Sequence, residues 1–200
     1  MLIKKNLNHR NILSIVAVAL LVIFFSLWII NLFKQKQNIP IQSIPQEAQQ
    51  ATQTLSGIAS VVDGDSIRVN NQKTEIRLLG IDAPEMKQKC LDKNYDEYKC
   101  GEVSKEFLTK LIAGKQIICY STGHDIYQRY LAYCFLAAQN INEEILKNGM
   151  AIIYDLNSAS DELKAIEQQA RNAKLGIWQG GFLEPKLYRK KNKNKKNKEK

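Results

Sequence analysis

The sequence lacks the closely spaced cysteines of a structural zinc site. Its four cysteines are separated by 10, 19 and 15 positions, at Cys90, Cys100, Cys119 and Cys134. Zinc sites usually contain at least one pair of ligands only about two to four residues apart. Four cysteines allow three disulfide pairings, and disulfides require an oxidising compartment. The cysteines therefore indicate either an exported domain with two disulfides or a cytosolic domain with four reduced thiols.

Acidic residues are absent from positions 1–46 and almost absent from positions 186–200. The first segment carries five Lys or Arg residues, and the last carries nine together with a single Glu. Residues 47–185 hold 15 basic and 19 acidic residues, so this part of the chain is mildly acidic. The net charge of +9 therefore comes from the two ends of the chain and does not by itself indicate a nucleic-acid-binding domain.

Charged residues are also missing from a run of 22 positions at 12–33. As a helix this run would extend roughly 33 Å, which exceeds the bilayer core of about 30 Å. It ends in bulky apolar residues without the small residues of a signal-peptide cleavage site, which favours an uncleaved transmembrane anchor over a cleaved signal. Three basic residues precede the run and two follow it, which favours a cytoplasmic flank at 1–11 and a domain in the periplasm or outside the cell.

Residues 34–56 are rich in Gln, contain two Pro and lack apolar periodicity, which predicts a flexible linker. A folded domain is expected at 57–185, followed by a disordered basic tail at 186–200.

Within that domain, short apolar runs bounded by turn residues predict five strands, at 58–62, 66–69, 74–81, 116–121 and 130–137. Apolar residues at helical spacing predict three helices, at 103–112, 142–149 and 161–173, the last with a capping signature beginning at Ser158. The predicted fold class is α+β: a five-stranded OB-fold β-barrel with three helices, preceded by one transmembrane helix.

Two acidic turns lie close together in the sequence. Asp63-Gly64-Asp65 separates the first two predicted strands, and Asp82-Ala83-Pro84-Glu85 ends the third. Either turn alone is typical of an ordinary loop. Together they could bring three carboxylates to neighbouring strand ends, and hard divalent cations such as Ca²⁺ prefer oxygen ligands. The two turns therefore indicate a candidate metal site.

Two arginines could complete a phosphate site beside these carboxylates. Arg77 interrupts the apolar third strand, and Arg129 begins the fifth. Strand alternation could instead direct Arg77 to solvent, as we expect for Arg68, and a lone Arg129 is more often a surface charge. Guanidinium groups bind phosphate oxygens in a bidentate manner and neutralise charge in a phosphoryl-transfer transition state. The arginines therefore favour phosphodiester chemistry if they face the acidic turns.

Four motifs occur in one order, at Asp63–Ser66, Arg77–Glu85, Asp125–Tyr133 and Gly176–Trp178. In this order and spacing, the chain from about Gly57 to Trp178 resembles the staphylococcal nuclease (thermonuclease) family. The resemblance implies an OB-fold nuclease that hydrolyses DNA and RNA with low sequence specificity and uses Ca²⁺ as cofactor. We expect a monomer that is held at the membrane by its N-terminal helix.

The resemblance also implies a role for each motif residue. The Ca²⁺ ligands would be Asp65, Asp82 and the backbone carbonyl of Ala83. Glu85 would be the general base or the residue that orients water, and Tyr127 would donate a hydrogen bond to a phosphate oxygen. Arg77 and Arg129 would bind the scissile phosphate and stabilise its transition state.

The cysteine layout resembles an exported branch of the same family, in which a Cys-x₉-Cys loop follows the Pro-Glu motif. This resemblance implies the disulfides Cys90–Cys100 and Cys119–Cys134.

One residue departs from the family pattern at the third motif. Gln128 stands where the family usually has Gly, and a positive φ at that position would strain the turn that directs Arg129. Two other functions therefore remain open. One is a catalytically impaired OB-type module that binds nucleic acid or protein, and the other is an anchored interaction protein whose basic tail does the binding.

Overall fold

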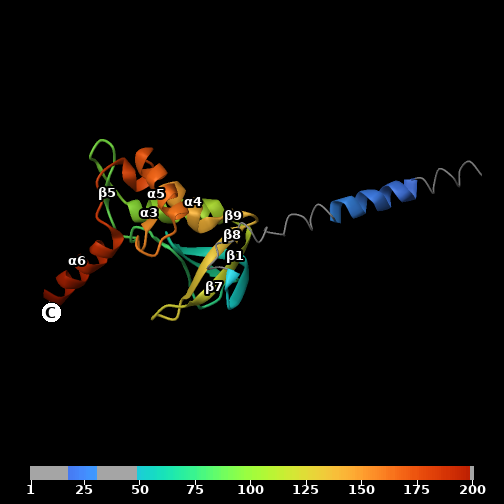
Figure 1. The fold of residues 1–200 in the computed structure, drawn as a ribbon, viewed down its shortest axis with the longest axis horizontal. Coiled ribbons are helices and arrows are strands. Elements are labelled where there is room, and N and C mark those ends of the chain that lie inside the picture. The colour runs from blue at the N-terminus through green and yellow to red at the C-terminus, as the bar shows by residue number, and fades with distance from the viewer. Residues whose placement is uncertain (1–17, 31–48, 199–200) are drawn as a thin grey trace, which may run out of the picture. The chain divides into compact units, whose positions relative to one another are not determined.

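The computed structural model describes residues 18–30 and 49–198 (Figure 1). The chain divides into two units, residues 1–39 and 40–200. In the first unit residues 18–30 are helical. Among the described residues, none of the helices has the length and apolar character needed to cross a bilayer. The predicted anchor at 12–33 extends beyond the described helix at both ends, and the predicted flank at 1–11 lies outside the described residues.

The second unit contains a closed five-stranded barrel, as predicted. Its strands are β1 (Gln53–Asp63), β2 (Ser66–Val69), β3 (Ile76–Leu78), β7 (Gln116–His124) and β8 (Tyr130–Leu136). They are hydrogen-bonded in the order β3-β2-β1-β7-β8, and a parallel pairing between β3 and β8 closes the barrel. The short strand β9 (Gln139–Asn140) extends the sheet beyond β8. This arrangement agrees with the predicted α+β class and a barrel of the OB type.

Strand β1 begins within the segment predicted as a flexible linker. Residues 53–56 pair with β7, where Leu55 lies opposite Cys119 and is buried. The sequence of this segment has too few apolar residues to indicate a strand, so its structure depends on the neighbouring strand β7. The remainder of the predicted linker, residues 34–48, lies outside the described residues.

The third predicted strand is broken in two at Gly80. Strand β3 ends at Leu78, and after Gly80, which has φ +84°, the chain resumes as β4 (Ile81–Asp82). A left-handed φ is readily adopted only by glycine, so Gly80 permits the kink. Strand β4 then pairs with β10 (Ile152–Ile153) instead of continuing in the barrel. The kink therefore redirects Asp82 away from the line of β3.

The three predicted helices are present as α3 (Cys100–Ile112), α4 (Ile141–Lys147) and α5 (Asp161–Asn172). The side chain that caps α5 belongs to Ser160, which accepts a hydrogen bond from the backbone N–H of Leu163, and not to Ser158 as predicted. A 3₁₀ helix, η2 (Gly176–Gln179), follows α5.

The expectation of a disordered tail from residue 186 does not match the structure. Helix α6 spans Pro185–Lys198. Its composition of Lys and Asn gives no apolar stripe. Three contacts hold its first turns and the residues just before them against the domain. The backbone carbonyl of Leu183 accepts a hydrogen bond from Gln88, Tyr188 donates one to Lys87, and Arg189 forms ion pairs with two carboxylates.

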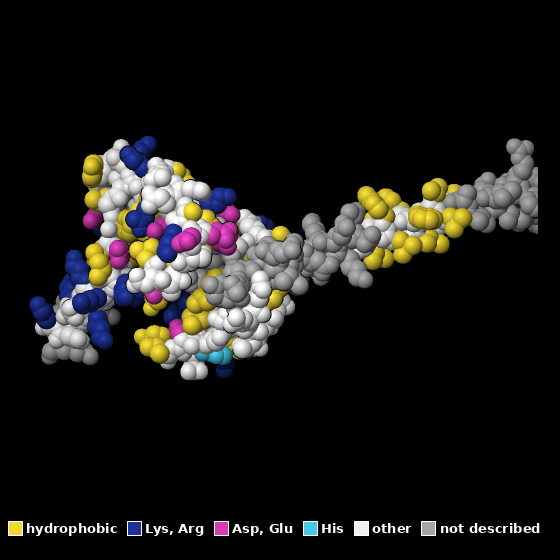
Figure 2. All heavy atoms as spheres, in the orientation of Figure 1, with side chains coloured by type: hydrophobic (Ala, Val, Ile, Leu, Met, Phe, Trp, Pro, Cys, Tyr) yellow, Lys and Arg dark blue, Asp and Glu magenta, His cyan; other side chains and the backbone are white. Residues whose placement is uncertain are grey.

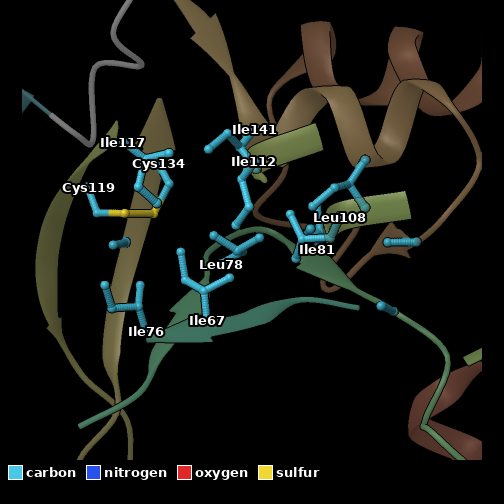
Figure 3. Close-up of a cluster of buried hydrophobic side chains, with 14 of the residues drawn as sticks. Ile67, Ile76, Leu78, Ile81, Leu108, Ile112, Ile117, Cys119, Cys134 and Ile141 are labelled. Carbon is cyan, nitrogen blue, oxygen red and sulfur yellow. A yellow bond between two sulfur atoms is a disulfide. The ribbon is translucent and has the colours of Figure 1, made fainter. Parts of the chain in front are cut away.

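The main core lies between the barrel and helices α3 and α4. Figure 3 shows its aliphatic side chains converging from strands and helices, with the Cys119–Cys134 disulfide joining β7 to β8 at one side. Ile67, Leu78 and Leu108 are fully buried in this cluster. Such burial is worth about 1.5–3 kcal/mol per large aliphatic side chain.

A second cluster surrounds the Cys90–Cys100 disulfide. Cys90 begins β5 (Cys90–Leu91), which pairs with β6 (Glu97–Tyr98), and Cys100 begins α3. Ile177, Trp178 and Phe182 pack against this disulfide. Both predicted cysteine pairings are therefore confirmed in the structure, and none of the described cysteines is free.

Asn142 connects α4 to the strands that carry the kink. Its buried side-chain amide donates hydrogen bonds to the carbonyls of Leu79, at 2.8 Å, and Ala132, at 3.2 Å. Its side-chain oxygen accepts a hydrogen bond from the Cys134 N–H at 3.0 Å. Leu79 directly precedes Gly80, so Asn142 fixes the position of the kink.

We expect Asn142→Ala to lower the free energy of unfolding by on the order of 2–3 kcal/mol, because it leaves the buried N–H of Cys134 unpaired and removes the hydrogen bonds to the carbonyls of Leu79 and Ala132. Chemical denaturation of the purified chain measures this loss. Asn157→Ala is the matched control, since Asn157 is exposed and a surface substitution changes stability by less than about 0.5 kcal/mol. Equal stability of the two variants would contradict this role of Asn142.

Candidate active site

Arg77 lies between two buried carboxylates. Its neighbours in β3, Ile76 and Leu78, point into the core, so alternation places Arg77 on the opposite face of the strand. There one guanidinium nitrogen pairs with Asp65 and the other with Asp82 at 2.8 Å. The Arg77 side chain is only 14% exposed, so it does not extend into solvent as strand alternation alone allowed.

The surroundings of Arg77 act on its pKa in opposite directions. Burial lowers the pKa of Arg77 most strongly, the Asp82 carboxylate raises it, and the positive charge of Arg129 lowers it further. The net effect is a pKa below the ordinary value of an arginine. Arg129 directly precedes β8, which pairs with β3, so the two predicted catalytic arginines come from neighbouring strands.

Asp65 is held by hydrogen bonds from three sides. Besides Arg77, it accepts one from the Ser66 hydroxyl at 3.2 Å and one from the Ala83 N–H at 2.6 Å. A Cβ at Gly64 would lie 2.7 Å from the Cβ of Ala83 and 2.8 Å from that of Ser104. Glycine at this position therefore lets the first acidic turn pack directly under the second.

Asp82 and Glu85 share a cationic partner that the sequence did not indicate. Arg189 of α6 places Nη1 2.9 Å from Asp82 Oδ1 and 2.8 Å from Glu85 Oε1, and Nη2 2.9 Å from Asp82 Oδ2. Asp82 is 2% exposed, whereas the side chain of Glu85 is 39% exposed. Asp82 is therefore contacted by two arginines, Arg77 and Arg189.

The backbone of Glu85 is fixed by residues outside the motif. Its N–H donates to the buried Gln88 side chain at 3.2 Å, and its carbonyl accepts from the Gln88 N–H at 2.7 Å. A Cβ at Gly101 would lie 1.9 Å from the Glu85 carbonyl oxygen, so only glycine allows α3 to approach this loop. The adjacent Cys90–Cys100 disulfide joins the end of the same loop to the start of α3.

Arg129 follows a tight turn between β7 and β8. The Asp125 carboxylate accepts hydrogen bonds from the N–H groups of Tyr127 and Arg129, both at 2.9 Å. Its Oδ2 also accepts from Nε and Nη2 of Arg129, both at 2.7 Å. Partial burial acts to raise the pKa of Asp125, but the hydrogen bonds from Arg129 and Tyr127 outweigh it and lower that pKa. Asp125 therefore orients both the turn and its arginine.

Gln128 has φ +64°, so the position does require the left-handed conformation that the family's glycine adopts freely. The turn is nevertheless formed, because the Gln128 N–H donates to the Asp125 carbonyl at 3.0 Å. Tyr127 is 74% exposed beside this turn, and the guanidinium carbon of Arg129 lies 5.7 Å from its ring centroid.

The carboxylates suit a hard cation in the type of their donor atoms. Asp65 and Asp82 both face Arg77, and Asp82 and Glu85 both face Arg189. The guanidinium groups of Arg77 and Arg189 thus supply the positive charge that balances these carboxylates. Within residues 18–30 and 49–198, no group of three or more His, Cys, Asp or Glu side chains is arranged closely enough to hold a metal ion. The oxygen donors therefore fit a divalent cation in chemistry, while a guanidinium already occupies the space beside Asp82 and Glu85.

The structure brings the predicted carboxylates together with Arg77, while Arg129 forms its ion pair with Asp125. Asp65, Asp82, Glu85 and Arg77 share one set of ion pairs through Arg77 and Arg189. The N–H of Ala83, and not its carbonyl, makes the recorded contact with Asp65, so the carbonyl's role as a ligand stays a prediction. Sequence reasoning missed Gln88, Gly101 and Arg189. For Arg189 one signal existed, because it is the sole Arg, next to the sole Tyr, in a run of Lys and Asn.

Comparison with known proteins points to one family. The family described as staphylococcal nuclease homologue matches residues 75–180. A succinoglycan biosynthesis protein, ExoI, from Rhizobium meliloti is 32% identical over 64% of this chain and 66% of its own length. An uncharacterized endonuclease from Haemophilus influenzae is 31% identical, over 68% and 73% respectively. Endonuclease YncB from Bacillus subtilis is 33% identical over 58% of each chain. The chain thus spans between 58% and 73% of the length of these relatives.

We expect Gln128→Gly to raise the free energy of unfolding by up to about 1 kcal/mol, because glycine removes the penalty of the left-handed conformation. Gln168→Gly is the control, since Gln168 is exposed within α5 and the same exchange there should cost about 1 kcal/mol. Chemical denaturation compares the two variants. Loss of stability in both would show that Gln128 is not strained.

Proposed function

Because the chain belongs to the staphylococcal nuclease family, we propose that it hydrolyses phosphodiester bonds in DNA and RNA, with Ca²⁺ as cofactor and with low sequence specificity. Support comes from the three relatives' alignments, two of which are to proteins named as endonucleases. The observation that carries the proposal is the ion-pair cluster in which Arg77 binds Asp65 and Asp82, while Asp82 and Glu85 both bind Arg189.

The two arginines would bind the scissile phosphate. Each now uses its guanidinium on carboxylates, Arg77 on Asp65 and Asp82, and Arg129 on Asp125. These ion pairs hold the side chains in place before substrate arrives, so little ordering remains when a phosphate binds. Their positive charge would then stabilise the charge that develops on the phosphate oxygens in the transition state.

Glu85 would accept a proton from the attacking water, or orient that water. Its backbone is fixed through Gln88 and by the close approach of Gly101, while its carboxylate remains partly exposed. A carboxylate in this setting can reach a water molecule beside a bound phosphate and can release the proton to solvent.

The proposed Ca²⁺ ligands are Asp65, Asp82 and the backbone carbonyl of Ala83. A cation bound there would polarise a phosphate oxygen and neutralise charge in the transition state. The exposed Tyr127, adjacent to Arg129, would donate a hydrogen bond to a phosphate oxygen. The proposed contacts with the substrate are all made to phosphate groups, which carry no sequence information, and this supports low sequence specificity. We propose that the enzyme acts as a monomer.

We expect the purified full-length chain to cleave single-stranded DNA with Ca²⁺, and EGTA to abolish the cleavage. Glu85→Gln and Arg77→Ala should each reduce the rate by about 10²–10³-fold, because they remove a proton acceptor and a transition-state charge. Gel electrophoresis of labelled DNA measures the cleavage. Glu102→Gln and Arg68→Ala are matched controls, since Glu102 is exposed and Arg68 pairs with Glu75, which is not one of the proposed catalytic carboxylates.

Binding of the labelled DNA without EGTA-sensitive cleavage would instead identify a module that binds nucleic acid. Unchanged cleavage in both site variants would overturn the assignment of Glu85 and Arg77.

We further propose that residues 12–33 anchor the protein in a membrane, with residues 1–11 cytoplasmic and the nuclease domain in the periplasm or outside the cell. The proposal is supported by the charge-free run and by the distribution of basic residues around it. Two disulfides in the domain are compatible with an oxidising compartment.

We expect all four cysteines to resist alkylation when cells are lysed in denaturant with an alkylating reagent, and to react fully after reduction. Denaturant is needed because each cysteine is at most 2% exposed in the folded domain. Mass spectrometry counts the modified cysteines. Sedimentation of the membranes from cells lysed without denaturant tests the anchor. Free thiols, or a chain that stays in the soluble fraction, would contradict the proposed location.

A further inference from the structure

Helix α6 forms most of the basic C-terminal segment and contacts the candidate active site. Figure 2 shows Lys and Arg side chains gathered along this helix. The helix lies beyond residue 180, where the match to the nuclease family ends. Among the basic residues of α6 whose side chains the structure describes, Arg189 is the one that makes ion pairs with the domain. The basic tail is therefore not wholly solvated, because the Arg189 side chain contacts Asp82 and Glu85.

Two contacts position Arg189 at these carboxylates. The Tyr188 hydroxyl donates to the Lys87 carbonyl at 3.0 Å, two residues after Glu85. Before the helix begins, the Leu183 carbonyl accepts a hydrogen bond from Gln88 at 2.6 Å. Gln88 is the residue that also fixes the Glu85 backbone. The start of α6 thus docks on the same loop that carries Glu85.

The guanidinium of Arg189 binds Asp82 through both of its terminal nitrogens. One of these nitrogens also bridges to Glu85, so a single positive group satisfies two carboxylates at 2.8–2.9 Å. The hydrogen bonds that Arg189 donates, those to Asp82 foremost, raise the pKa of Arg189 above its ordinary value. A divalent cation on Asp82 would need the same lone pairs and would be repelled by the guanidinium.

We propose that Arg189 is a built-in competitor of the divalent cation at Asp82 and Glu85, and that α6 must leave its docked position before the cation binds. The inference rests on the proposed function, because it takes Asp82 as a cation ligand. Release is local, since Arg189 is 38% exposed and α6 has no apolar stripe that buries it in the core. The docked helix is therefore an autoinhibited form of the site.

The affinity for Ca²⁺ alone tests this proposal without any nucleic acid. Calorimetric titration of the full-length chain with Ca²⁺ should give a dissociation constant about tenfold lower for Arg189→Ala than for the wild type. The apparent dissociation constant equals the intrinsic one divided by the fraction of molecules whose site can bind Ca²⁺. A tenfold difference therefore corresponds to a wild-type chain in which α6 is undocked in about a tenth of the molecules. Lys190→Ala removes the same charge from an exposed position on the same helix and should leave the affinity near that of the wild type.

Hydrogen–deuterium exchange of the wild-type chain gives a second measure. Saturating Ca²⁺ should increase exchange at the amides of residues 185–198 and leave that of α3 unchanged.

Equal Ca²⁺ affinity in Arg189→Ala and the wild type, or α6 amides that stay protected at saturating Ca²⁺, would overturn the competition and leave the proposed nuclease function standing. The first of these results is also what a purely catalytic role of Arg189 on the substrate would produce. Absence of Ca²⁺ binding in every variant, Arg189→Ala included, would overturn both this inference and the choice of Ca²⁺ as cofactor.

Discussion

The site depends on one buried charge, the guanidinium of Arg77. It is almost enclosed, and its positive charge is balanced by Asp65 on one side and Asp82 on the other. Removing a buried ion from water is costly unless partners compensate, and loss of one partner leaves an unpaired charge in the interior. The two acidic turns are therefore held at fixed positions by the same interaction that prepares the arginine for a phosphate.

The scaffold around Arg77 consists of places where the backbone approaches very closely. Gly64 lets the two acidic turns pack together, Gly80 redirects Asp82, and Gly101 brings α3 onto the Glu85 loop. Asn142 then fixes the kink by bonding to the carbonyl before it. These residues touch no substrate in the proposed mechanism, yet they set the distances between carboxylates and arginine. The geometry of the site thus depends on tight packing, and a substitution that enlarges one of these residues would disturb it.

Charge balance links the site to the C-terminal helix. Asp65 and Asp82 pair with Arg77, and Arg189 supplies a second positive charge to Asp82 and Glu85. Carboxylates that lie close together repel one another unless a positive charge is near. Arg189 relieves that repulsion and occupies the place of the proposed cation. The same electrostatic need that would draw a metal ion to the proposed site therefore accounts for the docking of the helix.

The sequence by itself determined the barrel and its three helices, because alternation, turn residues and helical spacing act over a few neighbouring positions. The order of its motifs indicated the family. The sequence also indicated Gln128 as a position of backbone strain. Tertiary structure alone decided that Arg77 faces inward, that residues 53–56 join the sheet and that Arg189 reaches Asp82. The strand and Arg189 depend on partners distant in sequence: β7 for residues 53–56, and carboxylates more than a hundred residues away for Arg189. Arg77 depends on two turns that lie on either side of it in the sequence and meet only in the folded chain. Local patterns carry no information about such partners, so only the folded chain reveals them.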